Sequence, residues 1–364
     1  MENGKPLRVC LFIGSHDIER QEMLKKILKL QGIEVLECIE KITGIVSFLK
    51  ANIKMYQKHR GLSYDVMIIP WRGFPIFPLA KIICKKPIIF MPTISIYDTL
   101  INDRKIAKPN SIRARFIRFA EKYACSHSDL LLPETMAQAS YFIREYNVEP
   151  RKFGNVVHSA DETKFFPQSF KEKSEYFEVL FFGKFVPAHG IKTIIESAKI
   201  LSNFKNIRFV LCGDGITKPA IERMVEELSL KNVILPGFVK VDNLIEYIKN
   251  SDVCLGIFSG GNKAQDTLTN KICQILASQK PLITMRSKAT DEFSFINEKN
   301  CLLVEPDNPE DLANAIIKMM KSDLMRKAIA SEGFQLFNKE LSMKATGLKL
   351  EKYIKNLIIN FNKS

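Results

Sequence analysis

The chain has 364 residues, of which 46% are hydrophobic and 26% are charged, so it is long enough for two ordinary soluble domains. No apolar stretch approaches the roughly 18 residues of a membrane helix, and the N-terminal residues lead directly into a strand, so neither a transmembrane segment nor a signal peptide is expected. The eight cysteines form no CxxC pair, which predicts reduced, buried thiols in the cytoplasm and gives no support to a zinc site.

The positive charge is concentrated in one part of the chain. Within the net charge of +14, residues 51–122 carry 14 Lys or Arg against 4 Asp or Glu. Such a region predicts an anionic partner: a membrane surface, nucleic acid or a phosphorylated substrate. No nucleic-acid-binding module is recognisable, so we expect no nucleic-acid partner.

The first half of the chain alternates buried strands with helices. Strands are expected at 8–14, 34–39, 65–70, 87–92, 129–132 and 155–161, and helices at 14–31 and 45–59. This alternation predicts a parallel, doubly wound α/β sheet. A polar run at 165–174, which contains Pro167, is the expected hinge to the second half.

The segment 111–124 has the pattern of a basic amphipathic helix. Its apolar residues fall together at helical spacing and are surrounded by Arg and Lys: Ile112, Phe116, Phe119, Ala120 and Tyr123. Two interpretations stay open. This face either docks on the sheet, as in an ordinary surface helix, or rests on anionic lipid headgroups.

The second half repeats the alternation. Strands are expected at 178–183, 208–213, 233–236, 253–258, 281–285 and 302–304, with helices between them, one of them at 268–278. A further helix starts at 307–311, and the tail from 324 to 360 is helical and amphipathic. The chain therefore has two α/β halves of similar size, with a cleft expected between them.

Three polar turns follow strands of the second half, at the place where open α/β sheets bind ligands. In the first, Gly183 allows a close approach of a ligand to the backbone, and Lys184 and His189 suit a diphosphate. In the second, Gly213 and Gly215 bracket an acid, which indicates either contact with a nucleotide or a plain tight turn. The third turn surrounds a helix start with groups suited to phosphate and sugar hydroxyls: Asp266, Thr269, Asn270, Lys271 and Gln274.

These stretches, in this order, resemble the family-4 nucleotide-sugar glycosyltransferases of GT-B architecture. The resemblance runs through GKFVPAHGIKTIIESAKIL, IRFVLCGDG, VILPGFVKVDNLIEYIKNSDVCLGIF, LTNKICQILASQKPLIT and NCLLVEPDNPEDLANAI. It continues more loosely in the first half, through IGSHDIERQEMLKKILKLQGIEVLEC, SDLLLPETMAQASYF and VVHSADETKFFP. It implies two Rossmann-like domains facing a central cleft, and transfer of a sugar from a nucleotide diphosphate sugar with retention and without a metal.

The chain departs from the family pattern at several positions. Lys184 and His189 stand where the family usually has Arg and Lys, and Asp266 and Gln274 stand where it usually has two glutamates. The resemblance implies that Lys184, His189, Lys271 and helix N-termini meet the charge of the leaving group. The substitutions leave two alternatives open: a degenerate, non-catalytic scaffold, or another GT-B enzyme such as a nucleotide-sugar epimerase or a phosphorylase.

The acceptor side is expected in the first half. Gly14 lies where the family brings a glycine-rich turn close to the diphosphate or acceptor, and Arg20 follows it. Asp98, after the fourth strand, is a candidate for handling the proton of the acceptor hydroxyl, and His16 is its rival. Asp17 serves either this site or the helix start as an N-cap.

The sequence thus predicts an acceptor domain at 1–168, a donor domain at 175–342, and a C-terminal helix at 343–364 that packs back toward the N-terminal domain. We expect a retaining, metal-independent glycosyltransferase of the hexosyltransferase class, with no cofactor beyond its nucleotide-sugar co-substrate. The acceptor is expected to be lipid-linked or a polysaccharide. The basic region 51–122 would hold the protein on the inner face of the cell membrane.

Overall fold

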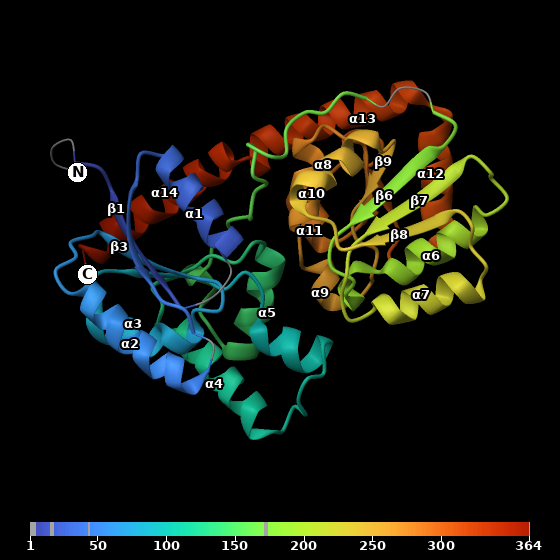
Figure 1. Cartoon of the computed structure of the whole chain (residues 1–364). Helices are drawn as coiled ribbons and strands as arrows, with labels where there is room; N and C mark the ends of the chain where they lie inside the picture. The colour runs from blue at the N-terminus through green and yellow to red at the C-terminus, as the bar shows by residue number, and fades with distance from the viewer. Residues whose placement is uncertain (1–4, 15–17, 43, 171–173, 364) are drawn as a thin grey trace. The chain divides into compact units, whose positions relative to one another are not determined.

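The structure, a computed structural model, describes residues 5–14, 18–42, 44–170 and 174–363 (Figure 1). It divides into two compact units. Unit 1 comprises Met1–His158 and Met343–Ser364, and unit 2 comprises Ser159–Ser342. The division lies before the segment 165–174 that we expected as the hinge, and part of that segment is bonded within unit 2. The backbone N–H of Gln168 donates to the carbonyl of Ser278 (3.1 Å), and buried Lys280 donates to the carbonyl of Ser169 (3.2 Å).

Unit 1 contains a five-stranded, parallel sheet in the order β2-β1-β3-β4-β5. Its strands are β1 Arg8–Ile13, β2 Glu34–Ile39, β3 Val66–Pro70, β4 Ile88–Met91 and β5 Leu130–Leu131. Its helices are α1 Ile18–Leu30, α2 Ile45–His59, α3 Phe77–Ile83, α4 Ile112–His127, α5 Met136–Tyr146 and α14 Met343–Phe361, with short helical turns η1 Phe74–Ile76, η2 Asp98–Asp103 and η3 Pro150–Lys152. The strand order reverses between β1 and β3, which is the switch point expected of a doubly wound sheet.

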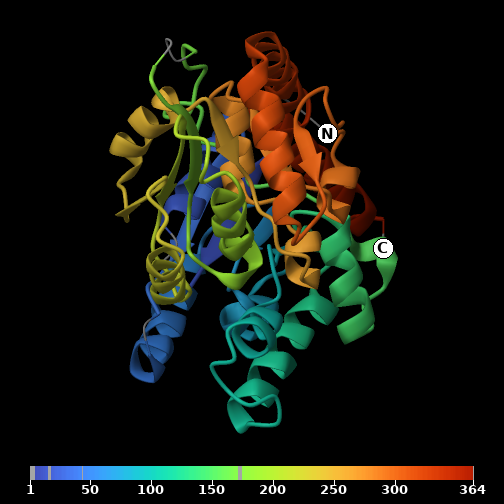
Figure 2. The ribbon, with the colours of Figure 1, turned by 90° about the vertical axis from the view of Figure 1, so that its right-hand side faces the viewer.

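The alternation of side chains along β1 explains why both faces of this sheet are covered. Val9 and Leu11 point to one face and pack in a cluster with α1 and α14. Cys10 and Phe12 point to the other face and join a cluster with α2, α3, α4 and α5. Figures 1 and 2 show these two layers of helices on either side of the strands. Because every β1 side chain from Val9 to Ile13 is buried, the strand reads as a continuous apolar run.

The C-terminal helix α14 belongs to unit 1, where it packs along α1. Lys349 donates to the side-chain oxygen of Asn155 (2.7 Å), and the ring of Tyr353 covers Gly154 so closely that a Cβ there would lie 2.4 Å from it. Glycine at 154 is therefore required by the close approach of α14.

The strand predicted at 155–161 does not form. Only Phe153, just before it, makes an isolated bridge to Leu131. The segment is instead held by α14, since the backbone N–H of Asn155 donates to the hydroxyl of Tyr353 (3.4 Å). The N–H of Val156 donates to the carbonyl of Pro133, just after β5 (2.9 Å), and Val156 and His158 line a pocket.

Unit 2 contains a six-stranded, parallel sheet in the order β11-β10-β9-β6-β7-β8. Its strands are β6 Phe177–Phe182, β7 Ile207–Cys212, β8 Val233–Gly237, β9 Val253–Leu255, β10 Leu282–Met285 and β11 Leu302–Val304. Its helices are α6 Ile191–Ile200, α7 Lys218–Glu227, α8 Val241–Asn250, α9 Asn262–Gln265, α10 Asn270–Ala277, α11 Lys288–Glu292, α12 Pro309–Lys321 and α13 Asp323–Leu336, with turns η4 Pro187–His189 and η5 Phe337–Leu341. Helices α6, α7 and α12 supply side chains to the main core of this unit (Figure 1).

Two predicted bounds in unit 2 are wrong. The strand expected at 253–258 ends at Leu255, because Gly256 packs against Thr284 and the N–H of Phe258 bonds to the carbonyl of His189 (3.1 Å) rather than to a neighbouring strand. The helix expected from Leu268 begins at Asn270, and the short helix α9 precedes it in the loop. Both changes bring backbone from the β9–α10 connection next to His189.

In the part of the chain that the structure describes, no helix is both long and apolar enough to span a bilayer. All eight cysteines are unpaired, and all but the partly exposed Cys84 are buried. This agrees with the predicted reduced and buried thiols.

Candidate functional site

The first cluster lies in unit 2, where β6 ends at Gly183. The Nζ of Lys271 lies 3.4 Å from Nδ1 of His189 and 3.7 Å from the ring centroid of Phe181. A Cβ on Gly183 would lie 3.0 Å from that same Nζ. Gly183 has φ +134°, a conformation that favours glycine. Gly183 and His189 of the first predicted turn and Lys271 of the third therefore meet at one point.

The charge of this cluster is unbalanced. Lys271 is only 5% exposed, and no carboxylate of the described residues forms an ion pair with it. Burial holds the pKa of its amine well below the ordinary value. Burial, and then the neighbouring Lys271, likewise hold the pKa of His189 well below its usual range. A site of buried nitrogen bases without a carboxylate favours binding of an anion, which would restore their protons.

The two glycine turns interlock beside this cluster. A Cβ on Gly213 would lie 2.0 Å from the carbonyl oxygen of Gly183, and one on Gly215 would lie 2.4 Å from the carbonyl oxygen of Phe185. The N–H of Phe185 also donates to the carbonyl of Asp214 (2.8 Å). The β6 and β7 turns thus form one packed layer of backbone, and Lys184 extends from it into solvent.

The N-terminus of α10 carries a polar group without a partner. Thr269 is the N-cap residue, yet its hydroxyl accepts no capping bond and is buried with no hydrogen-bond partner. Asn270 begins the helix, and Lys271 follows it. Since buried polar atoms are nearly always bonded, the hydroxyl of Thr269 indicates that a further group binds at this helix start.

The two residues at the predicted glutamate positions differ in their surroundings. The Oδ1 of Asp266 lies 3.1 Å from the Nζ of Lys288, in an exposed ion pair. Gln274 is half-buried in the second turn of α10. The structure therefore does not leave Asp266 as an isolated acceptor for sugar hydroxyls, because a substrate would share it with Lys288.

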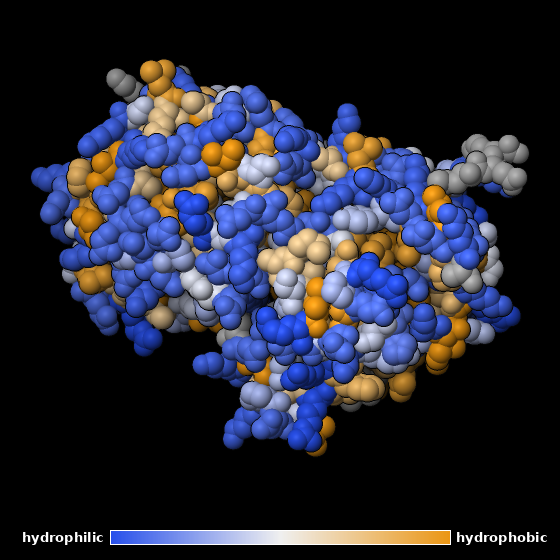
Figure 3. Space-filling view, turned by 180° about the vertical axis from the view of Figure 1, so that it is seen from behind, coloured by the Kyte–Doolittle hydropathy of each residue, from blue (hydrophilic) through white to orange (hydrophobic). Residues whose placement is uncertain are grey.

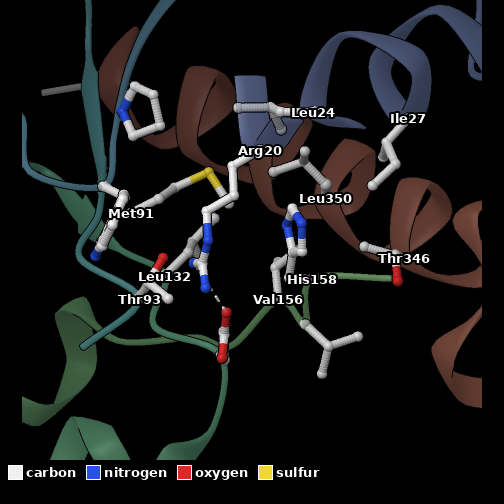
Figure 4. A pocket seen from close by; sticks show the side chains of 14 residues that line it. Arg20, Leu24, Ile27, Met91, Thr93, Leu132, Val156, His158, Thr346 and Leu350 are labelled. Carbon is white, nitrogen blue, oxygen red and sulfur yellow. Dashed lines mark hydrogen bonds and ion pairs between the residues drawn. The ribbon is translucent and has the colours of Figure 1, made fainter. Parts of the chain in front are cut away.

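The second cluster lies in unit 1, around Arg20. This residue stands in the first turn of α1, and its Nη1 lies 3.4 Å from Oε1 of Glu134 (Figure 4). Figure 4 shows the ring of His158 beside Leu350 of α14. Burial raises the pKa of Glu134 to about 7 in spite of Arg20, and burial together with Arg20 lowers the pKa of His158 to about 3. His158, for which the sequence predicted no role, thus lines the pocket as a neutral ring.

The predicted catalytic residues of unit 1 lie apart from this pocket or outside the described residues. Asp98 begins η2 and accepts a hydrogen bond from Nδ2 of Asn102 (2.8 Å). His16 and Asp17 lie outside the described residues. Gly14 follows β1, and a Cβ there would lie 2.7 Å from Ile42 and 2.8 Å from Ile76, so close packing explains this glycine. A role for Gly14 toward a ligand stays a prediction.

Buried Glu121 was missed by sequence reasoning. It accepts hydrogen bonds from the Ser95 hydroxyl (2.8 Å), the Ile96 N–H (2.7 Å) and the Tyr146 hydroxyl (2.6 Å). Burial raises the pKa of its carboxyl. Glu121 therefore fixes the segment that leads from β4 into Asp98. An acid in the middle of a basic amphipathic helix was the available signal.

Two aromatic residues in turns were also missed. Trp71, the single tryptophan of the chain, follows β3 in the sequence PWRGFP and lines the pocket of unit 1. Phe238 follows β8 and is 75% exposed, next to Gly237, whose carbonyl accepts from the N–H of Gly213 (2.8 Å). An aromatic directly after a strand that ends in Pro or Gly was the signal in both cases.

The described residues contain no group of three or more His, Cys, Asp or Glu that could hold a metal ion. The predicted independence from metal stays a prediction.

The sequence model of the family described as "Glycosyl transferases group 1" matches residues 162–336, which lie within unit 2. Residues 162–336 belong to the group 1 glycosyltransferases. The match contains both glycine turns, the Lys271–His189 pair and the start of α10. The family is thus assigned to this part of the chain, and the finer assignment to family 4 stays a prediction.

Similar proteins support the family and the fold. The chain is 23% identical over 259 residues to an uncharacterized glycosyltransferase of Methanocaldococcus jannaschii, which covers 71% of this chain and 68% of that protein. It is 21% identical over 207 residues to the N-acetylgalactosamine-N,N'-diacetylbacillosaminyl-diphospho-undecaprenol 4-alpha-N-acetylgalactosaminyltransferase of Campylobacter jejuni, covering 55% of this chain and only 53% of that enzyme. The solved structure of Anabaena HepE in complex with UDP superimposes with a TM-score of 0.71 at 13% identity, over 96% of this chain and 100% of that one. The chain thus has the GT-B fold that its sequence predicted.

Proposed function

We propose that this protein transfers a sugar from a nucleotide diphosphate sugar to a lipid-linked or polysaccharide acceptor, with retention and without a metal ion. One observation carries the proposal: Lys271 is a buried amine with no carboxylate partner among the described residues, beside His189 and Gly183. A diphosphate is the anion that the glycosyltransferase family would bring to this place. Two relatives described above agree, since one was solved in complex with UDP and the other is named for a diphospho-undecaprenol substrate.

The diphosphate would lie between Gly183 and the start of α10. Its oxygens would accept from the Nζ of Lys271, from the N–H groups at the N-terminus of α10 and from the Thr269 hydroxyl, which has no other partner. As the bond from the sugar to the diphosphate breaks, negative charge grows on the leaving oxygen. Cations and helix dipoles fixed in place before the reaction stabilise that charge, and this is the electrostatic role usual for such sites.

The remaining polar groups would orient the nucleotide and the sugar. The packed glycine turns at Gly213 and Gly215 let a nucleotide approach the backbone, and exposed Phe238 offers a flat face on which a base can stack. Gln274 and Asp266 would accept hydrogen bonds from sugar hydroxyls, with Lys288 sharing the carboxylate. Asp98 is our candidate for the group that receives the acceptor proton.

A thermal-shift screen with UDP, GDP, ADP and TDP sugars tests the donor. A ligand that binds only the folded state raises the free energy of unfolding by mass action, by about 2.7 kcal/mol at 100 times its Kd, and therefore raises Tm. Nucleotide release in the presence of an acceptor then tests transfer. Stabilisation without release, for every acceptor tried, would favour the alternative of a non-catalytic scaffold; product formed without any acceptor would favour an epimerase.

We also propose that unit 1 rests on the anionic, inner face of the cell membrane. Three residues of the apolar face predicted on α4 do not dock on the sheet, since Ile112 is 89% exposed, Phe116 63% and Phe119 68%. Ala120 of that face is buried, together with Ala114 and Ile117. Arg113, Arg115, Arg118 and Lys122 surround it and are exposed. On the face of the molecule that Figure 3 shows, apolar side chains are scattered among hydrophilic ones. Aromatic side chains ringed by cations suit a bilayer interface with acidic lipids.

Liposome sedimentation tests this surface. The protein should bind vesicles with anionic lipid and not purely neutral ones, and binding should weaken with salt. Replacing both Phe116 and Phe119 with Ser should reduce vesicle binding at least about 100-fold, because each inserted aromatic contributes about 1.5–3 kcal/mol. The matched control is Phe204→Ser in unit 2, at a phenylalanine that is 39% exposed. Equal binding to neutral and anionic vesicles would refute the electrostatic part.

A further inference from the structure

Helix α2, which lies beside α3 in unit 1 (Figure 1), has two apolar faces, and the fold covers only one of them. Ala51 and Met55 are buried, and Met55 belongs to a core cluster of the unit 1 sheet. The second face is exposed to solvent along the helix: Val46 is 68% exposed, Leu49 60%, Ile53 60% and Tyr56 46%. We call these four residues the α2 seam. Because a surface helix normally has polar residues on its outer face, the α2 seam is an unpartnered apolar surface.

The spacing of the α2 seam is that of a coiled-coil helix. Its residues follow one another at intervals of three, four and three along the chain. Val46 and Ile53 therefore take the a positions of a heptad, and the other two residues take the d positions. At about 3.6 residues per turn, all four fall within about 80° of the helix circumference. A stripe that faces a globular core is about 100° wide or more, whereas an a/d stripe is narrower, so the α2 seam fits the side of one other helix.

The residue types of the α2 seam agree with a contact between two helices. Both a positions hold β-branched residues, Val46 and Ile53, and the first d position holds Leu49. In parallel coiled coils this combination favours pairs of helices over larger bundles. Tyr56 at the second d position can pack its ring against a neighbour while its hydroxyl stays in water. The α2 seam therefore has the composition as well as the spacing of one half of a helix pair.

The exposed face of α4 differs from the α2 seam in composition and in the placement of its cations. Phe116 and Phe119 of α4 are surrounded by exposed Arg and Lys, an arrangement that suits lipid headgroups. The α2 seam has no Phe or Trp. Lys50 and Lys54 lie on one side of it, whereas Asn52 on the other side donates to a backbone carbonyl of the helix itself (2.7 Å). A narrow aliphatic stripe with cations on one side favours a helical partner over a bilayer surface.

Helix α2 contains no Asp or Glu, so it offers no acid to the lysines beside the α2 seam. Lys54 and Lys58 both lie near Glu40 of the preceding loop, with N–O distances of 3.9 Å and 2.9 Å. Lys50 is exposed and forms no ion pair with the described residues. It takes the e position after Leu49, where coiled coils carry the charges that select a partner. A second copy of α2 would bring lysine and no acid to this position, so charge complementarity favours an acidic partner over self-association.

We propose that the α2 seam binds an amphipathic helix of a partner protein, in which apolar a and d residues are flanked by Asp or Glu. The apolar residues of the partner helix pack against the α2 seam, and one of its acids faces Lys50. The contact uses no residue of the exposed α4 face. It goes beyond the transfer function proposed above and does not depend on it, since no residue of the donor cluster takes part.

Two synthetic peptides test the α2 seam on the full-length protein. Each has about four heptads with Val or Ile at a and Leu at d. One peptide has Glu at every e and g position and the other has Lys there, so like charge opposes the pairing of either peptide with itself. Fluorescence anisotropy of a labelled peptide measures binding. We expect the acidic peptide to bind with micromolar affinity, and the basic peptide at least about tenfold more weakly. Equal affinities of the two peptides, or no binding of the acidic peptide up to about 0.1 mM, overturn the proposal.

Substitutions in α2 separate recognition from folding. Leu49→Gln together with Ile53→Gln replaces two exposed residues by a good helix former, so Tm should change little. The acidic peptide should bind this double variant at least about tenfold more weakly. Lys50→Glu should reverse the preference between the two peptides. The matched control is Ile200→Gln, at an isoleucine of α6 that is 44% exposed, which should bind both peptides as the unaltered protein does. Equal affinity of the double variant and the control for the acidic peptide would count against the α2 seam.

Other occupants of the α2 seam give different results. If the Leu49→Gln, Ile53→Gln protein loses binding to anionic vesicles while the Phe116→Ser, Phe119→Ser protein keeps it, the α2 seam is a membrane surface and the proposal is wrong. If the unaltered protein self-associates in analytical ultracentrifugation and the α2 double variant does not, the α2 seam binds a second copy and the proposal is again wrong. The proposal is supported if the α4 double variant binds the acidic peptide with unchanged affinity while it loses vesicle binding.

Discussion

The two charged clusters differ in whether a carboxylate lies opposite their cation. In unit 2, Lys271 is buried beside another base, His189, and no carboxylate of the described residues pairs with it. In unit 1, Arg20 has a carboxylate opposite it, Glu134, and its guanidinium lies over the ring of Trp71. The first cluster is completed only by an anion from outside, whereas the second is already partly compensated. The family match lies within unit 2. The part of the chain that resembles group 1 enzymes is therefore the one whose buried base has no carboxylate partner and is suited to an anionic ligand.

The difference also concerns protons. Both bases in unit 2, His189 and Lys271, have lowered pKa values, so we expect them to take up protons from the solvent when an anion binds. In unit 1 the group that titrates near neutrality is an acid, Glu134. Changes of pH should therefore act on donor binding in one unit and on stability in the other.

The largest effect is expected from Lys271→Met. Removing the amine should reduce transfer about 10²–10³-fold, as loss of one fixed charge-stabilising donor does, and should abolish the thermal shift with the nucleotide sugar. The empty protein should melt higher, because a buried amine no longer has to be desolvated. Lys192→Ala, an exposed lysine of unit 2 paired with Glu196, is the control. A Lys271 variant that keeps the full ligand-induced shift would show that the phosphate is placed wrongly.

Next in size is the pH dependence of unit 1 stability. The pKa of Glu134 rises on folding to about 7 from 4.5, so its contribution is fully present below pH 4.5 and is lost as pH rises through 7. The loss should amount to about 3 kcal/mol. Urea unfolding followed by Trp71 fluorescence between pH 4.5 and 8 measures it, and Glu134→Gln should remove most of this slope. An unchanged slope in that variant would assign the dependence to another group.

Asp98→Asn should also reduce transfer activity, by less than Lys271→Met does. Transfer should fall about 100-fold, within the range of general base catalysis, while the affinity for the nucleotide sugar stays unchanged. Asn102→Ala, which removes only the hydrogen-bond partner of Asp98, is the matched control. His16→Gln tests the rival in the same assay. Full activity of the Asp98 variant together with loss in the His16 variant would reverse the assignment.

The smallest effect is the pH dependence of donor binding. Because the empty site holds His189 and Lys271 with lowered pKa values, binding of the diphosphate takes up protons and weakens as pH rises, by up to about tenfold per pH unit for each proton. Calorimetry of UDP-glucose or another bound nucleotide sugar in buffers of different ionisation enthalpy counts the protons. His189→Gln should take up fewer. Proton release on binding would contradict this account.

Several features of the molecule could be predicted from residue patterns alone. The bounds of β2 and α2 agree with the predicted ones, because apolar periodicity and the neighbouring Gly32 and Gly44 are local signals. The glycines at 183, 213 and 215 and the lysine at 271 were found in the same way, since each follows a strand end. By contrast, the strand expected at 155–161 does not form, and Asn155 in this segment bonds to Tyr353 and Lys349 of α14, which lie far away in sequence.

What the sequence by itself determined is the alternation of strands and helices, the two parallel sheets and the family of unit 2, since these depend on periodicity and on short motifs in a fixed order. Only the tertiary structure decided which charges are compensated. It buried Lys271 against Gly183, placed Arg20 and Arg72 near the ring of Trp71, and turned Phe116 and Phe119 of α4 to the solvent. The physical reason is that the free energy of a charge depends on its desolvation and on its partners in space, and neither can be read along the chain.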